Sequence, residues 1–152
     1  MSETTIAEVS GAPAMIEVGE GKERRTLRMS PLRLKEMGMW ERFVHARMSE
    51  AARGIAADVG MAEELVKRIS QIGWFADEST AVLRTIEGQL YATWLGIQIE
   101  EPTVSLDWYT THLQKFDQLN TAVGLFSELN FKRNSERSDE SKKVAEPASV
   151  SP

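Results

Sequence analysis

The pattern that most restricts the fold lies in the last third of the chain, where apolar residues recur at steps of three and four. Such steps place side chains on one face of an α-helix, whereas a half-buried strand alternates at every second residue. A break near Asp117 would divide this run into two helices, and without a break it would form one helix of about twenty-five residues. The run consists of Leu106, Tyr109, Leu113, Phe116, Leu119, Val123 and Phe126.

Three earlier segments have the same helical spacing. We expect the first helix to begin with Ser30 as the N-cap and Pro31 at the first helical position. The third is the most apolar and is expected to be central and to end at Glu101, while Ser105 can cap the last helical region. The apolar residues are Leu34, Met37, Trp40, Val44 and Met48 in the first segment, Ala62, Leu65, Val66, Ile69 and Ile72 in the second, and Val82, Leu83, Ile86, Leu90, Trp94 and Ile97 in the third.

In the segment before the helices, apolar residues recur at every second position. Ile16 and Val18 alternate with other residues, residues 19–21 (Gly-Glu-Gly) supply a turn, and Leu27 and Met29 continue the alternation. This predicts a short β-hairpin with these four apolar side chains on one face. Because two strands alone are marginally stable in water, a helix or another chain must cover that face.

These patterns predict a mainly α fold class, with a short N-terminal β-hairpin followed by four or five helices and disordered N- and C-terminal tails. Residues 1–13 are small and polar and form the expected disordered lead. Residues 14–130 form a single domain, which suits a chain of 152 residues with 41% hydrophobic content. Residues 131–152 are charged and poor in apolar side chains, so they form the expected disordered tail.

Composition and motifs argue against several function classes. The chain has no Cys, so disulfides, thiolate nucleophiles and Cys-ligated zinc are excluded. No signal peptide or membrane span is visible, and we expect a cytoplasmic protein. His45 and His112 lack the spacing of a metal motif, and the adjacent acidic pairs are explained by solvation or by helix starts. We therefore predict no enzyme activity, no metal and no cofactor.

A basic group stands out in a chain with a formal charge of −5. Outward-pointing Arg side chains on a strand can discourage edge-to-edge pairing, contact an acidic protein partner or lie along a phosphate backbone. The first interpretation, a solvated strand edge, is favoured. Nucleic-acid binding is the least favoured, because aromatic residues do not alternate with these Arg and Lys residues. Basic and acidic regions in one chain also allow a homo-oligomer. The basic patch consists of Arg24, Arg25, Arg28, Arg33 and Lys35.

Aromatic residues supply the candidate partner-binding positions. Trp40 falls on a core stripe, with Phe43 at its edge, whereas residues 74–75 (Trp-Phe) and Trp108 fall at helix boundaries. Exposed aromatics at boundaries are typical of partner contacts, and packing as a satellite core is the alternative. The candidates are Trp40, Phe43, Trp74, Phe75, Trp108 and Phe126.

The order of these elements resembles the tail assembly chaperones of long-tailed bacteriophages. In that family a hairpin with the pattern G-K-x-x-x-L-x-x-L leads into the first helix, and a W-L helix is followed by a Pro, Thr or Ser-capped segment. The resemblance covers residues 15–130. The matching positions are Gly21, Lys22, Leu27, Leu32, Trp94, Leu95, Pro102, Thr103 and Ser105.

The resemblance implies a protein without enzymatic activity that acts in the cytoplasm of the bacterial host. It would bind the tape measure protein and keep it soluble until the tail tube assembles, and the tail tube protein is a second candidate partner. Family members are commonly made with a frameshifted longer form and are absent from the finished virion. The alternatives are a structural phage protein, either a head-tail joining or a tail component, and a small helical nucleic-acid-binding regulator.

Overall fold

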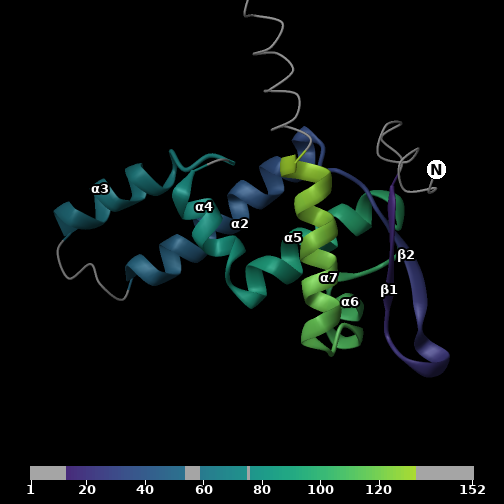
Figure 1. Ribbon diagram of the computed structural model, residues 1–152. Coiled ribbons are helices and arrows are strands. Elements are labelled where there is room, and N and C mark those ends of the chain that lie inside the picture. Colours follow the sequence, from purple (N-terminus) through teal and green to yellow (C-terminus); the bar gives the residue numbers. More distant parts are fainter. Residues whose placement is uncertain (1–12, 54–58, 75, 133–152) are drawn as a thin grey trace, which may run out of the picture.

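The computed structural model describes residues 13–53, 59–74 and 76–132. Within these ranges an antiparallel hairpin is followed by six α-helices (Figure 1), which confirms the predicted mainly α fold class with an N-terminal β-hairpin. Almost all of the predicted lead and tail lies outside the described residues. The elements are β1 (Ala14–Val18), β2 (Arg25–Met29), α2 (Leu34–Arg53), α3 (Val59–Ile69), α4 (Asp77–Leu83), α5 (Ile86–Glu100), α6 (Leu106–His112) and α7 (Phe116–Ser127).

Helix α5 is the central element, as its apolar character predicts. It packs against β2 and α7 and also against α2, α4 and α6. Its residues Ala92, Leu95 and Ile97 are fully buried. Figure 1 shows the hairpin at one end of the molecule and the α2–α3 pair at the other. Helix α5 therefore joins both ends to one hydrophobic core.

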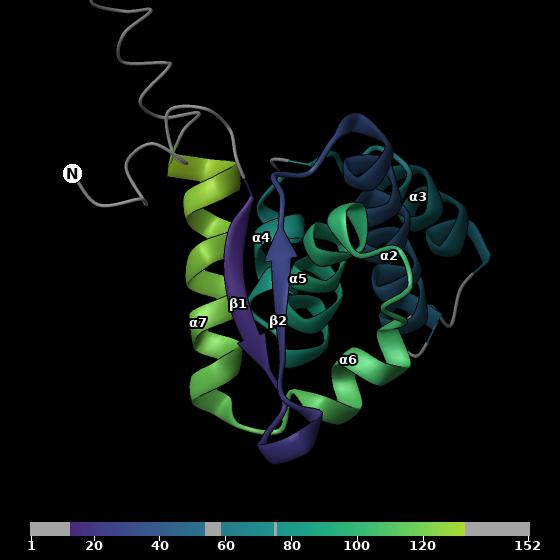
Figure 2. The same cartoon turned by 90° about the vertical axis from the view of Figure 1, so that its right-hand side faces the viewer.

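The hairpin has the predicted inner face. Ile16, Val18, Leu27 and Met29 are all buried, and Ile16 is paired with Leu27 across the strands. Helix α5 packs against β2 and helix α7 against β1 (Figure 2). The cover that the two strands need is thus provided by helices of the same chain.

A glycine allows the hairpin to approach α5 closely. The Ser30 N–H donates to the Gly96 carbonyl oxygen at 3.0 Å, directly after β2 ends. A Cβ atom on Gly96 would lie 3.0 Å from Met29 Cγ and 3.0 Å from the Ser30 oxygen. These distances are tighter than ordinary van der Waals contact, so a larger residue at this position would require Met29 or the Ser30 backbone to shift by a few tenths of an ångström.

Helix α2 begins at Leu34 and not at Pro31, so the predicted Ser30 cap is wrong. Ser30 Oγ instead donates to Glu100 Oε1 at 2.6 Å. Leu32 is buried in the core at 6% exposure. The segment between β2 and α2 is therefore held by contacts to distant parts of the chain, and the helix starts only after it.

Leu34 does not lie on the core stripe where the sequence places it. Its side chain is 87% exposed, whereas the buried positions of α2 are Glu36, Trp40 and Val44. At about 100° per residue, Leu34 lies well outside this buried face. The second predicted helix corresponds to α3, which packs on α2.

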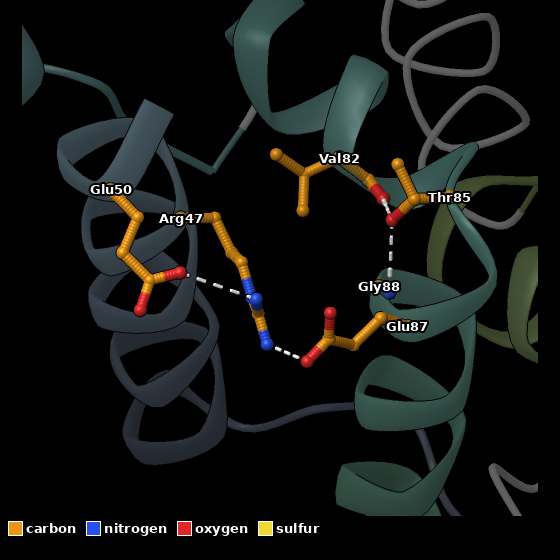
Figure 3. Close-up of polar contacts among 6 residues, drawn as sticks. All are labelled: Arg47, Glu50, Val82, Thr85, Glu87 and Gly88. Carbon is orange, nitrogen blue, oxygen red and sulfur yellow. Dashed lines mark hydrogen bonds and ion pairs between the residues drawn. The ribbon is translucent and has the colours of Figure 1, made fainter. Parts of the chain in front are cut away.

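The third predicted helix is two helices, α4 and α5, which meet at Thr85. Thr85 Oγ1 donates to the Val82 carbonyl oxygen at 2.6 Å and accepts from the Gly88 N–H at 3.0 Å (Figure 3). The same hydroxyl therefore bonds the end of α4 and caps the start of α5. A Cβ atom on Gly88 would lie 2.0 Å from the Val82 oxygen, so the tight junction requires glycine there.

The last apolar run also forms two helices, which settles the alternative that the sequence leaves open. Helix α6 ends at His112 and α7 begins at Phe116, because the backbone leaves the helical region at Leu113. The predicted cap is confirmed, since Ser105 Oγ accepts from the Trp108 N–H at 3.0 Å. The predicted end of α5 is also confirmed, with Glu101 as its C-cap.

Candidate partner-binding groove

Two of the six predicted partner-binding residues are interior residues. Trp40 is 2% exposed and Phe126 is 1% exposed. The Trp40 indole Nε1 donates to Ser79 Oγ at 2.7 Å, which joins α2 to α4. Both rings belong to the hydrophobic core, so neither is available at the surface of this structure.

Trp74 is half-buried and packs against aromatic neighbours. Its ring stacks on Phe131, with centroids 5.9 Å apart, and meets the edge of Trp40 at 6.5 Å. The backbone N–H of Trp74 donates to Glu41 Oε1 at 3.0 Å. A cavity of about 150 Å³ lies beside these rings. Trp74 thus belongs to a satellite of the core, while Phe75 lies outside the described residues.

Trp108 is also half-buried and is enclosed by two basic side chains. The Arg25 guanidinium lies 5.0 Å from the centroid of the indole ring, a cation–π distance. The His112 imidazole stacks on the same indole at 4.3 Å. His112 Nε2 lies 3.2 Å from Glu23 Oε2 at the tip of the hairpin. Trp108 therefore helps to hold the hairpin tip against α6.

Phe43, another of the predicted partner-binding residues, borders an open groove. Its ring stacks on Tyr91 of α5 with centroids 4.3 Å apart and an angle of 10° between the planes. This pair forms part of a groove of about 420 Å³ in which side chains of α2, α5 and α6 meet. The lining residues are Phe43, Glu87, Leu90, Tyr91, Leu106, Asp107 and Thr110.

The groove combines an apolar lining with two carboxylates. Glu87 is ion-paired with Arg47 of α2, which also contacts Glu50 at 3.4 Å (Figure 3). The Asp107 carboxylate makes no ion pair with any residue in the described part of the chain. Burial raises the pKa of the Tyr91 phenol, although the Arg42 guanidinium opposes this shift. The groove can therefore take an apolar group and offers negative charge beside it.

Sequence reasoning identified only Phe43 among the residues of this groove. Leu90 and Leu106 were assigned to core stripes, and Tyr91 was not singled out. The periodicity of each helix shows which side is apolar, but it cannot show that three helices leave a gap where those sides meet. The one available signal was the presence of Tyr91 close to Leu90 and Trp94 on a helix that is apolar all round.

The structure does not gather the five residues of the basic patch in one place. Arg24 is ion-paired with Glu17, and Arg28 Nε donates to Glu101 Oε1 at 3.3 Å. Arg25 lies over Trp108, as described above. Arg33 and Lys35 follow the end of β2 that is opposite to Arg24, and five residues of a strand span about 17 Å. Three of the five charges thus already contact groups of the same chain.

In residues 13–53, 59–74 and 76–132, no group of three or more His, Asp or Glu side chains is arranged to hold a metal ion. No helix in those ranges is long and apolar enough to cross a membrane. Comparison of the chain with protein-family models, with curated proteins and with solved structures gave no match in any of the three.

Proposed function

We propose that the protein is a tail assembly chaperone of a long-tailed bacteriophage, which binds the tape measure protein in the host cytoplasm and keeps it soluble during tail assembly. The resemblance of the hairpin, the W-L helix and the capped segment to that family motivates the proposal. A chaperone of this kind needs an accessible apolar surface for its client and enough charge to keep the complex dissolved.

The groove of about 420 Å³ is the observation that carries this proposal. Its stacked Phe43 and Tyr91 rings and its two leucines offer rigid apolar contact area of the kind that dominates protein interfaces. A helical client could place one apolar side chain into such a groove, as amphipathic helices do in other helix-in-groove complexes. We therefore assign client binding to the groove rather than to Trp40 or Phe126.

Co-expression with the tape measure protein of the same phage tests the function. The tape measure protein should be soluble only when the chaperone is present, and the two should co-elute in size-exclusion chromatography with light scattering. A tape measure protein that stays insoluble while the chaperone elutes alone would reject the function. Mass spectrometry of purified virions would then show whether the protein is a structural component, present at a fixed copy number.

A matched pair of substitutions tests the groove. Thr110→Arg places a large side chain at the groove, and Thr121→Arg places the same side chain on α7. Both threonines are exposed, and each hydroxyl bonds to a backbone oxygen of the preceding turn. Thr110→Arg should abolish co-elution, and Thr121→Arg should leave it unchanged. Equal co-elution of both variants would remove the groove from the proposal.

A further inference from the structure

The charge at the groove suggests which kind of client segment fits it. The described lining comprises two leucines, two aromatic rings, one threonine and two carboxylates. The nearby cation is Arg47, whose guanidinium lies 5.2 Å from the centroid of the Phe43 ring. Because Glu87 is paired with Arg47, a segment with an apolar side chain alone would leave the Asp107 carboxylate without an ion-pair partner among the described residues. Charge complementarity therefore favours a client with a positive charge beside its apolar residue.

The two carboxylates are not equivalent. Glu87 already has a cationic partner in Arg47, on the wall formed by α2 and α5 (Figure 3). Asp107 lies on the α6 side of the groove and makes no ion pair with any described residue. Asp107 is therefore the group that remains to meet a charge brought by a client.

We propose that the groove recognises a helical segment that presents an apolar side chain with a Lys or Arg one turn away, the apolar side chain lying against Phe43 and Tyr91 and the cation pairing with Asp107. This inference rests on the proposed function, because it specifies the client segment of the same site. On a helix, residues three or four apart lie on one face, so one segment can supply both groups.

Two synthetic amphipathic helical peptides provide the probe. Both carry the same leucine stripe, and they differ only in having Lys or Glu one turn from the central leucine. Binding to the full chain is measured by fluorescence anisotropy at low salt. The Lys peptide should bind about fivefold more tightly than the Glu peptide, which is the size expected for one partly exposed charge pair. This preference should shrink as salt is added.

Charge reversal separates recognition from folding. Asp107→Lys should reverse the preference, so that the Glu peptide binds more tightly. Asp117→Lys is the matched control, because Asp117 is also exposed and is also the second residue of its helix, α7. This control should leave the preference unchanged. Circular dichroism of both variants checks that the helices are intact.

Three results would overturn the inference: equal binding of the two peptides to the unchanged chain, binding of neither peptide, or an unreversed preference in the Asp107→Lys variant. None of them would reject the chaperone function, which depends on solubility and co-elution of the tape measure protein. Conversely, a tape measure protein that is insoluble in co-expression rejects the function whichever peptide binds.

Discussion

The hydroxyl oxygens of Thr93 and Tyr109 lie 2.7 Å apart, and both residues are fully buried. The Thr93 hydroxyl also lies 2.8 Å from the Gln89 carbonyl oxygen, to which it donates its proton. The Tyr109 hydroxyl is therefore the donor to Thr93, since each hydroxyl has only one proton. This bond connects the central helix α5 to α6, beside the candidate groove.

Tyr109 is expected to make the folded state sensitive to alkaline pH. Burial raises the pKa of its phenol to about 12, against an ordinary value of 10.0. Because the pKa of Tyr109 is raised in the folded state, its neutral form contributes fully to the free energy of unfolding below pH 10. This contribution is lost as the pH rises toward 12. Two pKa units correspond to about 2.7 kcal/mol. Urea unfolding gives the free energy of unfolding below pH 10 and near pH 12. The decrease between these two pH values should be smaller in Tyr109→Phe than in the unchanged chain, and equal decreases would contradict this account.

Gly96→Ala is expected to destabilise the contact between the hairpin and α5. The added methyl group would meet Met29 and the Ser30 carbonyl oxygen at 3.0 Å, and overpacking of this kind costs about 1–3 kcal/mol. Gly38→Ala is the control, because a Cβ atom there meets nothing within 4 Å. It should stabilise α2 by about 0.5–1 kcal/mol. Thermal unfolding measures both, and a Gly96→Ala variant as stable as the unchanged chain would show that the strand can shift freely.

Ser79→Ala should destabilise the domain by leaving the Trp40 indole N–H buried without its partner at 2.7 Å. The expected loss is about 1–3 kcal/mol in the free energy of unfolding. Ser70→Ala provides the comparison, because the Ser70 hydroxyl is exposed and, among the described residues, bonds only to the Lys67 carbonyl oxygen. Its effect should stay within about 0.5 kcal/mol. Similar midpoints of urea unfolding for the two variants would contradict the assigned role of Ser79.

Thr85→Ala should weaken the junction of α4 and α5 by removing the cap on the Gly88 N–H. Loss of a threonine N-cap costs about 1 kcal/mol. Thr80→Ala is the control, since the exposed Thr80 hydroxyl makes only a long contact of 3.5 Å to the Ala76 carbonyl oxygen. Amide hydrogen exchange should show faster exchange in the first turn of α5 for Thr85→Ala alone. Unchanged protection in that turn would rule out the capping role.

The candidate site was less predictable than the fold. Phe43 was correctly placed at the edge of the core stripe of α2, and it borders the groove. Trp40 and Phe126 were named with it because large aromatics often serve interfaces, yet both are needed inside the core. The groove depends on how α2, α5 and α6 cross, and no periodicity within one helix contains that information.

The local features of this protein follow from short sequence patterns. The alternation of Ile16, Val18, Leu27 and Met29 specified the inner face of the hairpin, and Ser105 specified the start of α6. In each case the cause lies within a few residues, because side-chain alternation and capping are local effects. The apolar character of α5 likewise indicated its central place.

The positions at which the helices begin and break, and the place of the groove, depend on contacts between distant parts of the chain. Ser30 bonds to Glu100, seventy positions away, so α2 starts only at Leu34. The apolar stripe continues across Thr85, and only packing of α4 against α5 turns that residue into a junction. Helical periodicity reports which side of a segment is buried, whereas contacts between distant residues determine where each segment ends and what space remains between them.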